Sequence, residues 1–189
     1  MKRILLVFAI CYCSISMFAE HPVVLGVNLG EVTATEFKSI LREKGWALAD
    51  GSSGNMYEGT FAGYSGSQLL IISSDKTNKI AKVVIYLPKK SSWSSLKRNY
   101  EDLQSTYEAK YGATKNNFHF FSKPYYEGDG YEMSAVKIEK CYYACIWELD
   151  GYFISVEISK YQQVKITYED TEILNEIKYE RQVQAASDI

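Results

Sequence analysis

The sequence predicts an α+β fold in which an antiparallel sheet carries helices packed on one face. Segments with helical spacing of apolar residues alternate with groups of short runs that are rich in β-branched and aromatic residues. Short turns join these runs, so neighbouring strands should pair as hairpins. The expected order is helix, three strands, helix, four strands, helix. This order indicates a tandem α-β-β-β repeat with units 20–90 and 91–189, which could form one continuous domain.

The first helix is predicted over residues 34–44. Thr33 and Glu36 have the spacing of a capping box, in which each side chain bonds the backbone N–H of the other residue. Gly45 can end this helix because glycine tolerates a positive φ. A short strand is predicted before it, over residues 23–29.

Three strands are predicted next, and Pro88 ends the third because proline lacks the N–H that a strand ladder needs. Polar residues 74–78 form the turn before that strand. The expected strands cover residues 56–63, 68–73 and 79–87.

The second helix should begin after Ser91 and Ser92, which can cap it, and end at Gly112. Trp93 lies in its first turn and is expected to anchor it on the sheet. The buried face is marked by an apolar stripe that repeats every three or four residues. The stripe consists of Leu96, Tyr100, Leu103, Tyr107 and Tyr111.

The C-terminal region is predicted to add four strands and a last helix over residues 171–184. Asp150-Gly151 is a signal for a type I′ hairpin turn. The expected strands cover residues 131–139, 142–149, 152–159 and 164–168. The last helix should dock through Ile173, Leu174 and Ile177. Strand alternation assigns to the core Trp147, Ile154, Val156, Ile158, Val164 and Ile166.

The N-terminus predicts a signal peptide over residues 1–19. Lys2 and Arg3 precede the uncharged run 4–18, and Ala19 is a small residue at the cleavage site. The run is shorter than the roughly 20 residues that span a bilayer. We therefore expect an exported protein, periplasmic or secreted, with no membrane span after cleavage.

Two alternatives concern the same segment. Cleavage after Ser16 is one, and lipid attachment at Cys11 or Cys13 is the other. A lipid-attachment motif needs a small residue before the cysteine, whereas Ile10 and Tyr12 stand there. A lipoprotein is therefore disfavoured.

The overall composition excludes several classes of protein. Hydrophobic residues make up 47% of the chain, which is too many for a disordered protein of low hydrophobicity. The formal net charge of −2 lacks the positive field that attracts nucleic acid, so we expect no nucleic-acid partner.

Cysteine and histidine offer little catalytic chemistry. On a strand, Cys141 and Cys145 would stand about 13 Å apart, too far for a disulfide. We interpret Cys145 as a small buried hydrophobic residue, and we expect no metal and no cofactor. His119 stands among aromatic residues and is interpreted as a packed or partly exposed strand residue rather than a catalytic base.

The most unusual string, residues 125–132, combines three tyrosines, two glycines and three carboxylates. Its acids do not match a calcium loop beyond Asp129. Glu127 with Asp129 or Glu132 could form a glycosidase pair. The string could also be a turn-rich loop leading into a strand, or a recognition loop, since tyrosine offers large contact area at low entropic cost. The candidate binding residues are Tyr125, Tyr126, Glu127, Asp129 and Tyr131.

Several motifs along the mature chain carry a resemblance: LGVNLG, TATEFKSILREKGW, KIAKVVIYLP and PYYEGDGYEM. With them the chain resembles a group of uncharacterised exported proteins of Gram-negative gut bacteria, which implies export but no particular activity. The order of elements is loosely similar to the tandem fold of the β-lactamase-inhibitor-protein-like group. Fold analogy does not establish function, so no inhibitory residue is carried over.

These observations favour a non-enzymatic binding or interaction protein of the cell envelope or extracellular space. Its expected surface is the open sheet face together with the loop 123–132, and its partner is an unidentified protein or glycan. A carbohydrate-contacting envelope protein is the alternative. A carboxylate-dependent hydrolase is the third hypothesis.

Overall fold

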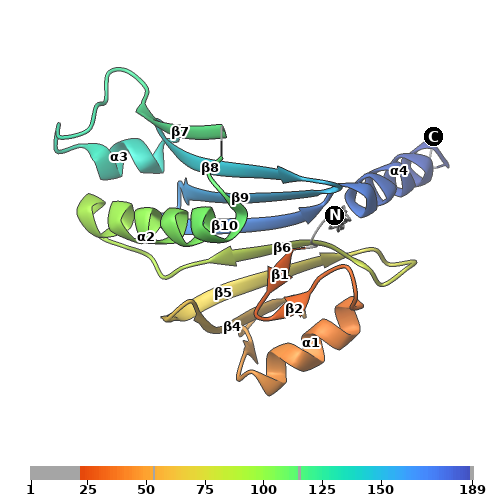
Figure 1. Cartoon of the computed structure of the whole chain (residues 1–189). Helices are drawn as coiled ribbons and strands as arrows, with labels where there is room; N and C mark the ends of the chain where they lie inside the picture. The colour runs from red at the N-terminus through yellow and green to blue at the C-terminus, as the bar shows by residue number, and fades with distance from the viewer. Residues whose placement is uncertain (1–21, 53, 115, 188–189) are drawn as a thin grey trace, which may run out of the picture.

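The computed structural model of the chain describes residues 22–52, 54–114 and 116–187. The predicted signal peptide, 1–19, and its alternative processing sites lie outside these residues. Eight strands form one antiparallel sheet (Figure 1). The predicted α+β class with an antiparallel sheet is therefore confirmed.

The order of the strands divides the sheet into two halves. The first half contains β3 (Ala47–Leu48), β4 (Met56–Phe61), β5 (Tyr64–Ser73) and β6 (Ile80–Tyr86). The second half contains β7 (Asn116–Phe121), β8 (Cys141–Leu149), β9 (Tyr152–Ser159) and β10 (Gln163–Asp170). The strands follow the order β3-β4-β5-β6-β10-β9-β8-β7, so the halves meet where β6 pairs with β10. The repeat itself, with its units 20–90 and 91–189, stays a prediction.

Two helices, α1 (Ala34–Glu43) and α2 (Trp93–Tyr111), contribute to a core on one face of this sheet. The predicted capping box is confirmed, since the Thr33 hydroxyl accepts from the Glu36 N–H and Glu36 accepts from the Thr33 N–H. The predicted ends of α2 are confirmed too. The Ser92 hydroxyl accepts from a backbone N–H in the first turn, and Gly112 follows the last turn at φ 82°.

Alternate strand residues complete the core beneath these helices. Across β8, β9 and β10, Val156 faces both Cys145 and Ile166. The stripe of α2 packs on this face, as Leu96, Tyr100 and Leu103 are buried in the same cluster. Every residue that the alternation assigned to the core is buried: Trp147, Ile154, Val156, Ile158, Val164 and Ile166.

The first half has a close contact between an indole and a glycine. Trp46 follows α1 and is buried against β4. A Cβ atom added at Gly59 would lie 2.4 Å from the Trp46 ring. Only a glycine therefore fits beneath this ring without a shift of the surrounding atoms.

The last helix, α4 (Thr171–Ser187), begins where β10 ends and projects from the end of the sheet (Figure 1). Asp170 caps it by accepting from the Ile173 N–H at 2.9 Å. Ile173 and Ile177 pack on Ala81 of β6, with Leu174 partly buried beside them. The predicted docking residues are therefore confirmed.

The prediction of a strand over residues 131–139 is wrong. That segment contains the short helix α3 (Glu132–Lys137). Glutamate, methionine, alanine and lysine are good helix formers, and the acid at the start and lysine at the end suit the helix dipole. The partner of β8 at the sheet edge is instead β7, a strand that the sequence analysis did not delimit.

Three local details of the predicted strands and turns also differ. Residues 23–29 form a small hairpin of β1 (Val23–Val24) and β2 (Val27–Asn28), because Leu25 and Gly26 both turn the chain at positive φ. β4 stops before Ala62 and Gly63, whose positive φ values make a turn, so β5 begins at Tyr64 rather than at residue 68.

The third difference concerns the Asp150-Gly151 hairpin. Leu149 faces Tyr152, so the two-residue connection between β8 and β9 is confirmed. Only Gly151 has a positive φ, of 77°, so the turn is not of the predicted type I′, which needs positive φ at both residues. The glycine alone adopts the conformation that an L-residue disfavours.

Candidate functional site

The candidate loop connects β7 to α3 and is held down by its own carboxylates. Glu127 accepts hydrogen bonds from Lys97 Nζ at 2.5 Å, from the Tyr143 hydroxyl at 2.8 Å and from Trp93 Nε1 at 3.3 Å. The bond from Lys97 lowers the pKa of Glu127, Tyr143 and Trp93 lower it further, and partial burial opposes them. Glu127 thus fastens the loop to α2 and β8.

Asp129 shapes the loop from within. Its carboxylate accepts from the backbone N–H of Tyr126 at 3.1 Å and from that of Tyr131 at 2.7 Å. Glu132 accepts from the Gly128 N–H at 2.8 Å. The predicted acids are therefore engaged in the loop's own structure.

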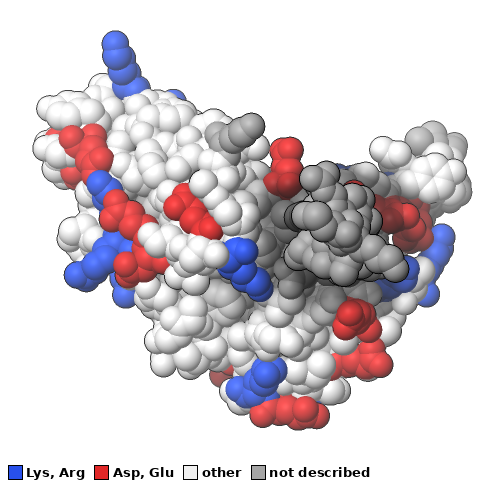
Figure 2. All heavy atoms as spheres, viewed as in Figure 1, with Lys and Arg blue, Asp and Glu red and all other residues white. Residues whose placement is uncertain are grey.

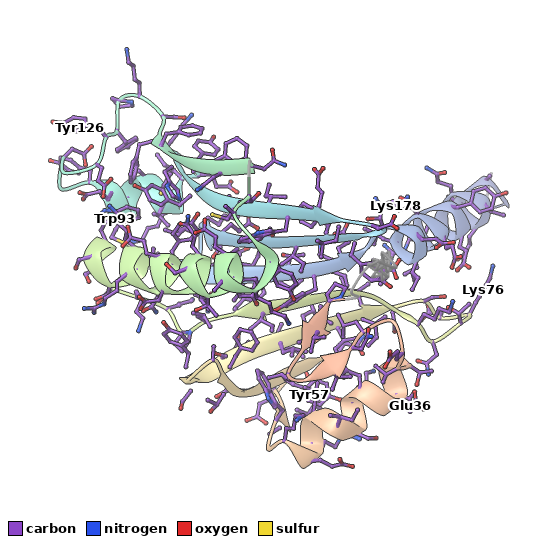
Figure 3. The ribbon with its side chains drawn as sticks, in the orientation of Figure 1. Glu36, Tyr57, Lys76, Trp93, Tyr126 and Lys178 are labelled. Carbon is purple, nitrogen blue, oxygen red and sulfur yellow. The ribbon has the colours of Figure 1, made fainter. Side chains whose placement is uncertain are left out.

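The tyrosines of the loop differ in their exposure. Tyr126 and Tyr131 are each 65% exposed, and Tyr125 is partly buried. Figure 3 shows Tyr126 on the loop and Trp93 near the start of α2. The binding role of Tyr125, Tyr126, Glu127, Asp129 and Tyr131 stays a prediction.

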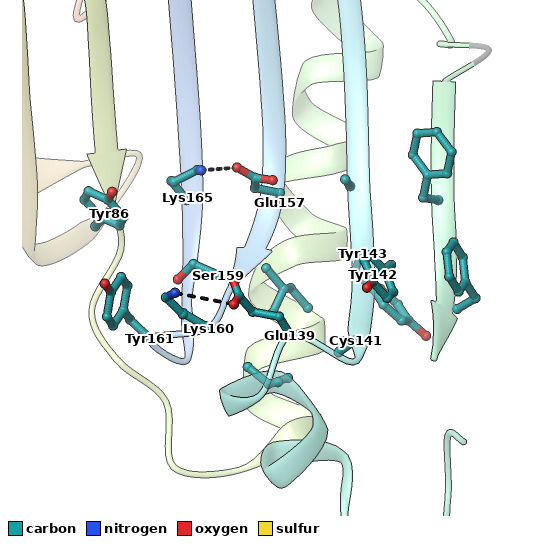
Figure 4. A pocket seen from close by; sticks show the side chains of 15 residues that line it. Tyr86, Glu139, Cys141, Tyr142, Tyr143, Glu157, Ser159, Lys160, Tyr161 and Lys165 are labelled. Carbon is teal, nitrogen blue, oxygen red and sulfur yellow. Dashed lines mark hydrogen bonds and ion pairs between the residues drawn. The ribbon is translucent and has the colours of Figure 1, made fainter. Parts of the chain in front are cut away.

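A concave site lies on the sheet face opposite α2. We call it the aromatic groove; its volume is about 490 Å³ (Figure 4). Aromatic rings stand at its two sides, and small or charged side chains form its floor. Its lining includes Tyr86, Phe118, Phe120, Tyr142, Ala144, Glu157, Ser159, Lys165 and, on the turn between β9 and β10, Tyr161.

The groove follows from the pairing of five strands. Tyr86 faces Lys165, Lys165 faces Glu157, Glu157 faces Ala144 and Ala144 faces Phe118. Paired residues in antiparallel strands share a face, so these side chains form one row across the sheet. The small side chain of Ala144 lies between larger neighbours and leaves the hollow.

Aromatic side chains of the groove remain exposed although they are large. Tyr161 is 56% exposed, Phe120 49%, Phe118 44% and Tyr142 42%. Phe120 and Tyr142 stack across β7 and β8, with ring centroids 4.8 Å apart and planes inclined by 19°. Together these two rings make a flat apolar platform at one side of the groove.

The charges of the groove are paired. Lys165 forms an ion pair with Glu157 on the floor, and Lys160 lies 3.4 Å from Glu139 at the rim, as the dashed lines of Figure 4 show. The groove therefore offers hydrogen-bond donors and acceptors without a strong field of one sign. Charges of both signs are also interspersed on the face shown in Figure 2.

Beneath β7, on the helix side, a polar cluster joins His119 to a thiol. The Tyr100 hydroxyl lies 2.9 Å from His119 Nε2 and 3.0 Å from Cys145 Sγ. Burial lowers the pKa of His119 and raises that of Cys145. A reactive cysteine needs a lowered pKa and exposure, so this buried thiol fits a packing role. His119 lies on β7 with its ring stacked on Tyr143.

Two further features bear on the predicted chemistry. Within the described ranges, no group of three or more histidine, cysteine, aspartate or glutamate residues could hold a metal ion. In the same part of the chain, no helix is long and apolar enough to cross a membrane.

Sequence reasoning predicted a binding surface on the open sheet face, but it found neither the groove nor the set of residues that line it. The alternation along β8 does place Tyr142 and Ala144 on the face opposite Trp147, which was an available signal. Phe118 and Phe120 lie on the strand that was not delimited. The pairing of Glu157 with Lys165 depends on strand register, which local sequence does not determine.

Comparisons with known proteins add no relative. No protein-family model, no curated protein and no solved structure matches this chain.

Proposed function

We propose that this chain is an exported, non-enzymatic binding protein that holds its partner in the aromatic groove. The observation that supports the proposal is the set of large rings left partly exposed around a concave surface. Aromatic side chains bury much area when a partner covers them, and they are enriched where proteins bind other molecules.

The dimensions of the groove suit an extended segment of a protein partner. Its row of paired residues runs from Tyr86 on β6 to Phe118 on β7, across four strand spacings. At about 4.8 Å per spacing this is roughly 19 Å, the length of an extended peptide of about six residues. The ion pair of Lys165 and Glu157 offers polar contacts at mid-length.

A carbohydrate partner is the second candidate, and the platform of Phe120 and Tyr142 favours it. The apolar face of a sugar ring can lie on such a platform while its hydroxyl groups bond to nearby polar side chains. Ser159 and Glu157 lie in the same groove and could serve as those polar groups.

A carboxylate-dependent hydrolase ranks third. A general acid of this kind works with a raised pKa, whereas Lys97 lowers the pKa of Glu127. Asp129 is occupied by backbone N–H groups of its own loop, and Glu157 is paired with Lys165.

The proposal can be tested with a display library of short peptides and a glycan array, probed with the mature chain. The groove variant carries Tyr142→Ala and Tyr161→Ala. The control carries Tyr126→Ala and Tyr131→Ala, which removes two tyrosines of the loop that are each 65% exposed. We expect enriched peptides whose affinity falls at least about tenfold in the groove variant, since an aromatic anchor contributes more than about 1 kcal/mol.

Two other outcomes would point to a different partner or to a different surface. Binding on the glycan array alone, lost in the groove variant, supports the carbohydrate alternative. Loss of binding in the loop control with full binding in the groove variant contradicts the groove and supports the loop 123–132.

A further inference from the structure

The outer edge of β7 is unpaired in the described part of the chain. β7 ends the strand order, and only β8 pairs with it. All but the last of its residues are exposed. Such an edge presents backbone N–H and C=O groups that can pair with another strand.

The backbone groups that point outward can be identified. The Ser122 N–H donates to the Lys140 carbonyl at 2.8 Å, which extends the ladder between β7 and β8. In an antiparallel pair, every second residue of a strand directs its N–H and C=O groups toward the neighbouring strand, and the residues between them direct theirs to the other side. Residues 118 and 120 therefore bond toward β8, while Asn117, His119 and Phe121 direct theirs outward.

The composition of this edge is unusual for a free strand. Natural proteins protect free edges with lysine, proline, a bulge or short length. β7 spans six residues, contains three phenylalanines and has neither lysine nor proline. The opposite edge, β3, is only two residues long. The edge of β7 carries three phenylalanines, two asparagines and one histidine, with neither lysine nor carboxylate. It therefore favours a partner strand that is likewise rich in phenylalanine and free of lysine and carboxylate, a description that β7 of a second copy meets.

We propose that two copies of this chain pair through β7 in antiparallel fashion, with His119 facing the partner's His119. In this register Asn117 faces the partner's Phe121, so every outward residue meets an outward residue and each facing pair exchanges two hydrogen bonds. On the groove face, Phe118 faces the partner's Phe120.

The alternative register, centred on Phe118, pairs fewer of the outward N–H and C=O groups of β7. It would pair Asn117 with the partner's His119 and leave the outward groups of Phe121 beyond the partner's β7. It would also set Phe120 against the partner's Asn116 rather than against a ring. The register centred on His119 therefore combines the larger number of hydrogen bonds with two phenylalanine contacts across the interface.

The pairing also extends the aromatic groove. Phe118 and Phe120 form one side of the groove, and the partner's Phe118 and the partner's Phe120 would continue that side beyond the edge. The two sheets would form one continuous sheet with two grooves.

The experiment is the molar mass of the mature chain, measured by light scattering over a range of micromolar concentrations. The F118K/F120K variant places like charges opposite each other and should be monomeric. The matched control Y126K/Y131K has the same change of charge on exposed loop residues and should dimerise like the wild type. Circular dichroism checks that every variant is folded, which is expected since both phenylalanines are exposed.

A charge-swap variant, F118K/F120E, tests the register. In the proposed register each new lysine faces the partner's new glutamate, so the dimer should re-form at low salt. In the register centred on Phe118, the new lysines would face each other. A wild-type monomer at all concentrations, a dimer that survives F118K/F120K, or a charge-swap variant that stays monomeric at low salt would overturn the proposal.

Discussion

At the residue scale, Gly59 and Trp46 illustrate how one missing side chain makes room for a large one. A methyl group at Gly59 would come within 2.4–2.8 Å of three atoms of the Trp46 ring. The ring cannot move freely because it is buried among the side chains of the core. The packing of the Trp46 ring in the first half therefore depends on the absence of a Cβ atom at position 59 of β4.

We predict that Gly59→Ala lowers the free energy of unfolding by about 1–3 kcal/mol, the usual cost of overpacking a core. The cost should be smaller in a Trp46→Phe background, because the smaller ring leaves space for the methyl group. Urea denaturation of the wild type, the two single variants and the double variant measures the loss of unfolding free energy caused by Gly59→Ala in each background. Equal costs in both backgrounds would show that the ring is not the cause.

Glu127 is the second residue whose role can be measured directly. Because Lys97 lowers its pKa in the folded chain below the ordinary 4.5, folding favours the ionised form. The stabilisation is present above pH 4.5 and is lost as the pH falls through the lowered pKa. The Glu127 side chain is 43% exposed, so we expect the stabilisation from this ion pair to be less than about 1 kcal/mol.

The test is an NMR titration of Glu127 in the wild type and in Lys97→Met. The variant should raise the pKa of Glu127 toward its ordinary value. In parallel, Glu127→Gln should lower the urea midpoint at pH 7 but change it little below pH 3. An unaltered titration in Lys97→Met would mean that this hydrogen bond does not form in solution.

At the element scale, periodicity was informative where an element has a buried and an exposed side. The stripe on α2 and the alternation on β9 and β10 predicted these elements because their core residues repeat at the expected spacing. α3 is only six residues long and has no such repeat. β7 lies at an edge with five exposed residues, so its sequence lacks the alternation of a half-buried strand.

The candidate site was less predictable than the fold for a related reason. The groove depends on Phe118, Ala144, Glu157, Lys165 and Tyr86 facing one another across five strands. Register between strands distant in sequence is a property of the assembled sheet. The predicted loop, in contrast, was visible in one continuous string, and its acids turned out to be engaged in holding the loop.

The central strands provide a stability prediction at this scale. Val156 is fully buried between Cys145 and Ile166, so Val156→Asp should place an unpaired charge in the core and cost more than about 4 kcal/mol. Tyr142→Asp, on the open face of β8, is the control and should leave the fold intact. A urea midpoint of Val156→Asp equal to that of the wild type would contradict the assignment of faces.

At the scale of the whole molecule, the two halves share a sheet and a core. β6 and β10 pair across five residues, and one buried cluster contains residues of both halves, including Trp46 and Trp147. A continuous core makes cooperative unfolding the expected behaviour. The units 20–90 and 91–189 would then be parts of one domain.

We therefore predict one unfolding transition for both halves. Two variants that each retain a single tryptophan, Trp46 or Trp147, should report the same urea midpoint by fluorescence after correction for the substitutions. Trp93 and the remaining tryptophan are replaced by phenylalanine in each. Two separate midpoints would indicate that the halves fold as independent domains.

For the molecule as a whole, we predict that the open sheet face binds the partner. Hydroxyl-radical footprinting of the mature chain, with and without a peptide enriched from the library, tests this most directly. Bound peptide is expected to protect Tyr142, Tyr161 and Phe120, while Tyr126 and Tyr131 react as before. Protection of Tyr126 and Tyr131, with the groove still reactive, would contradict it.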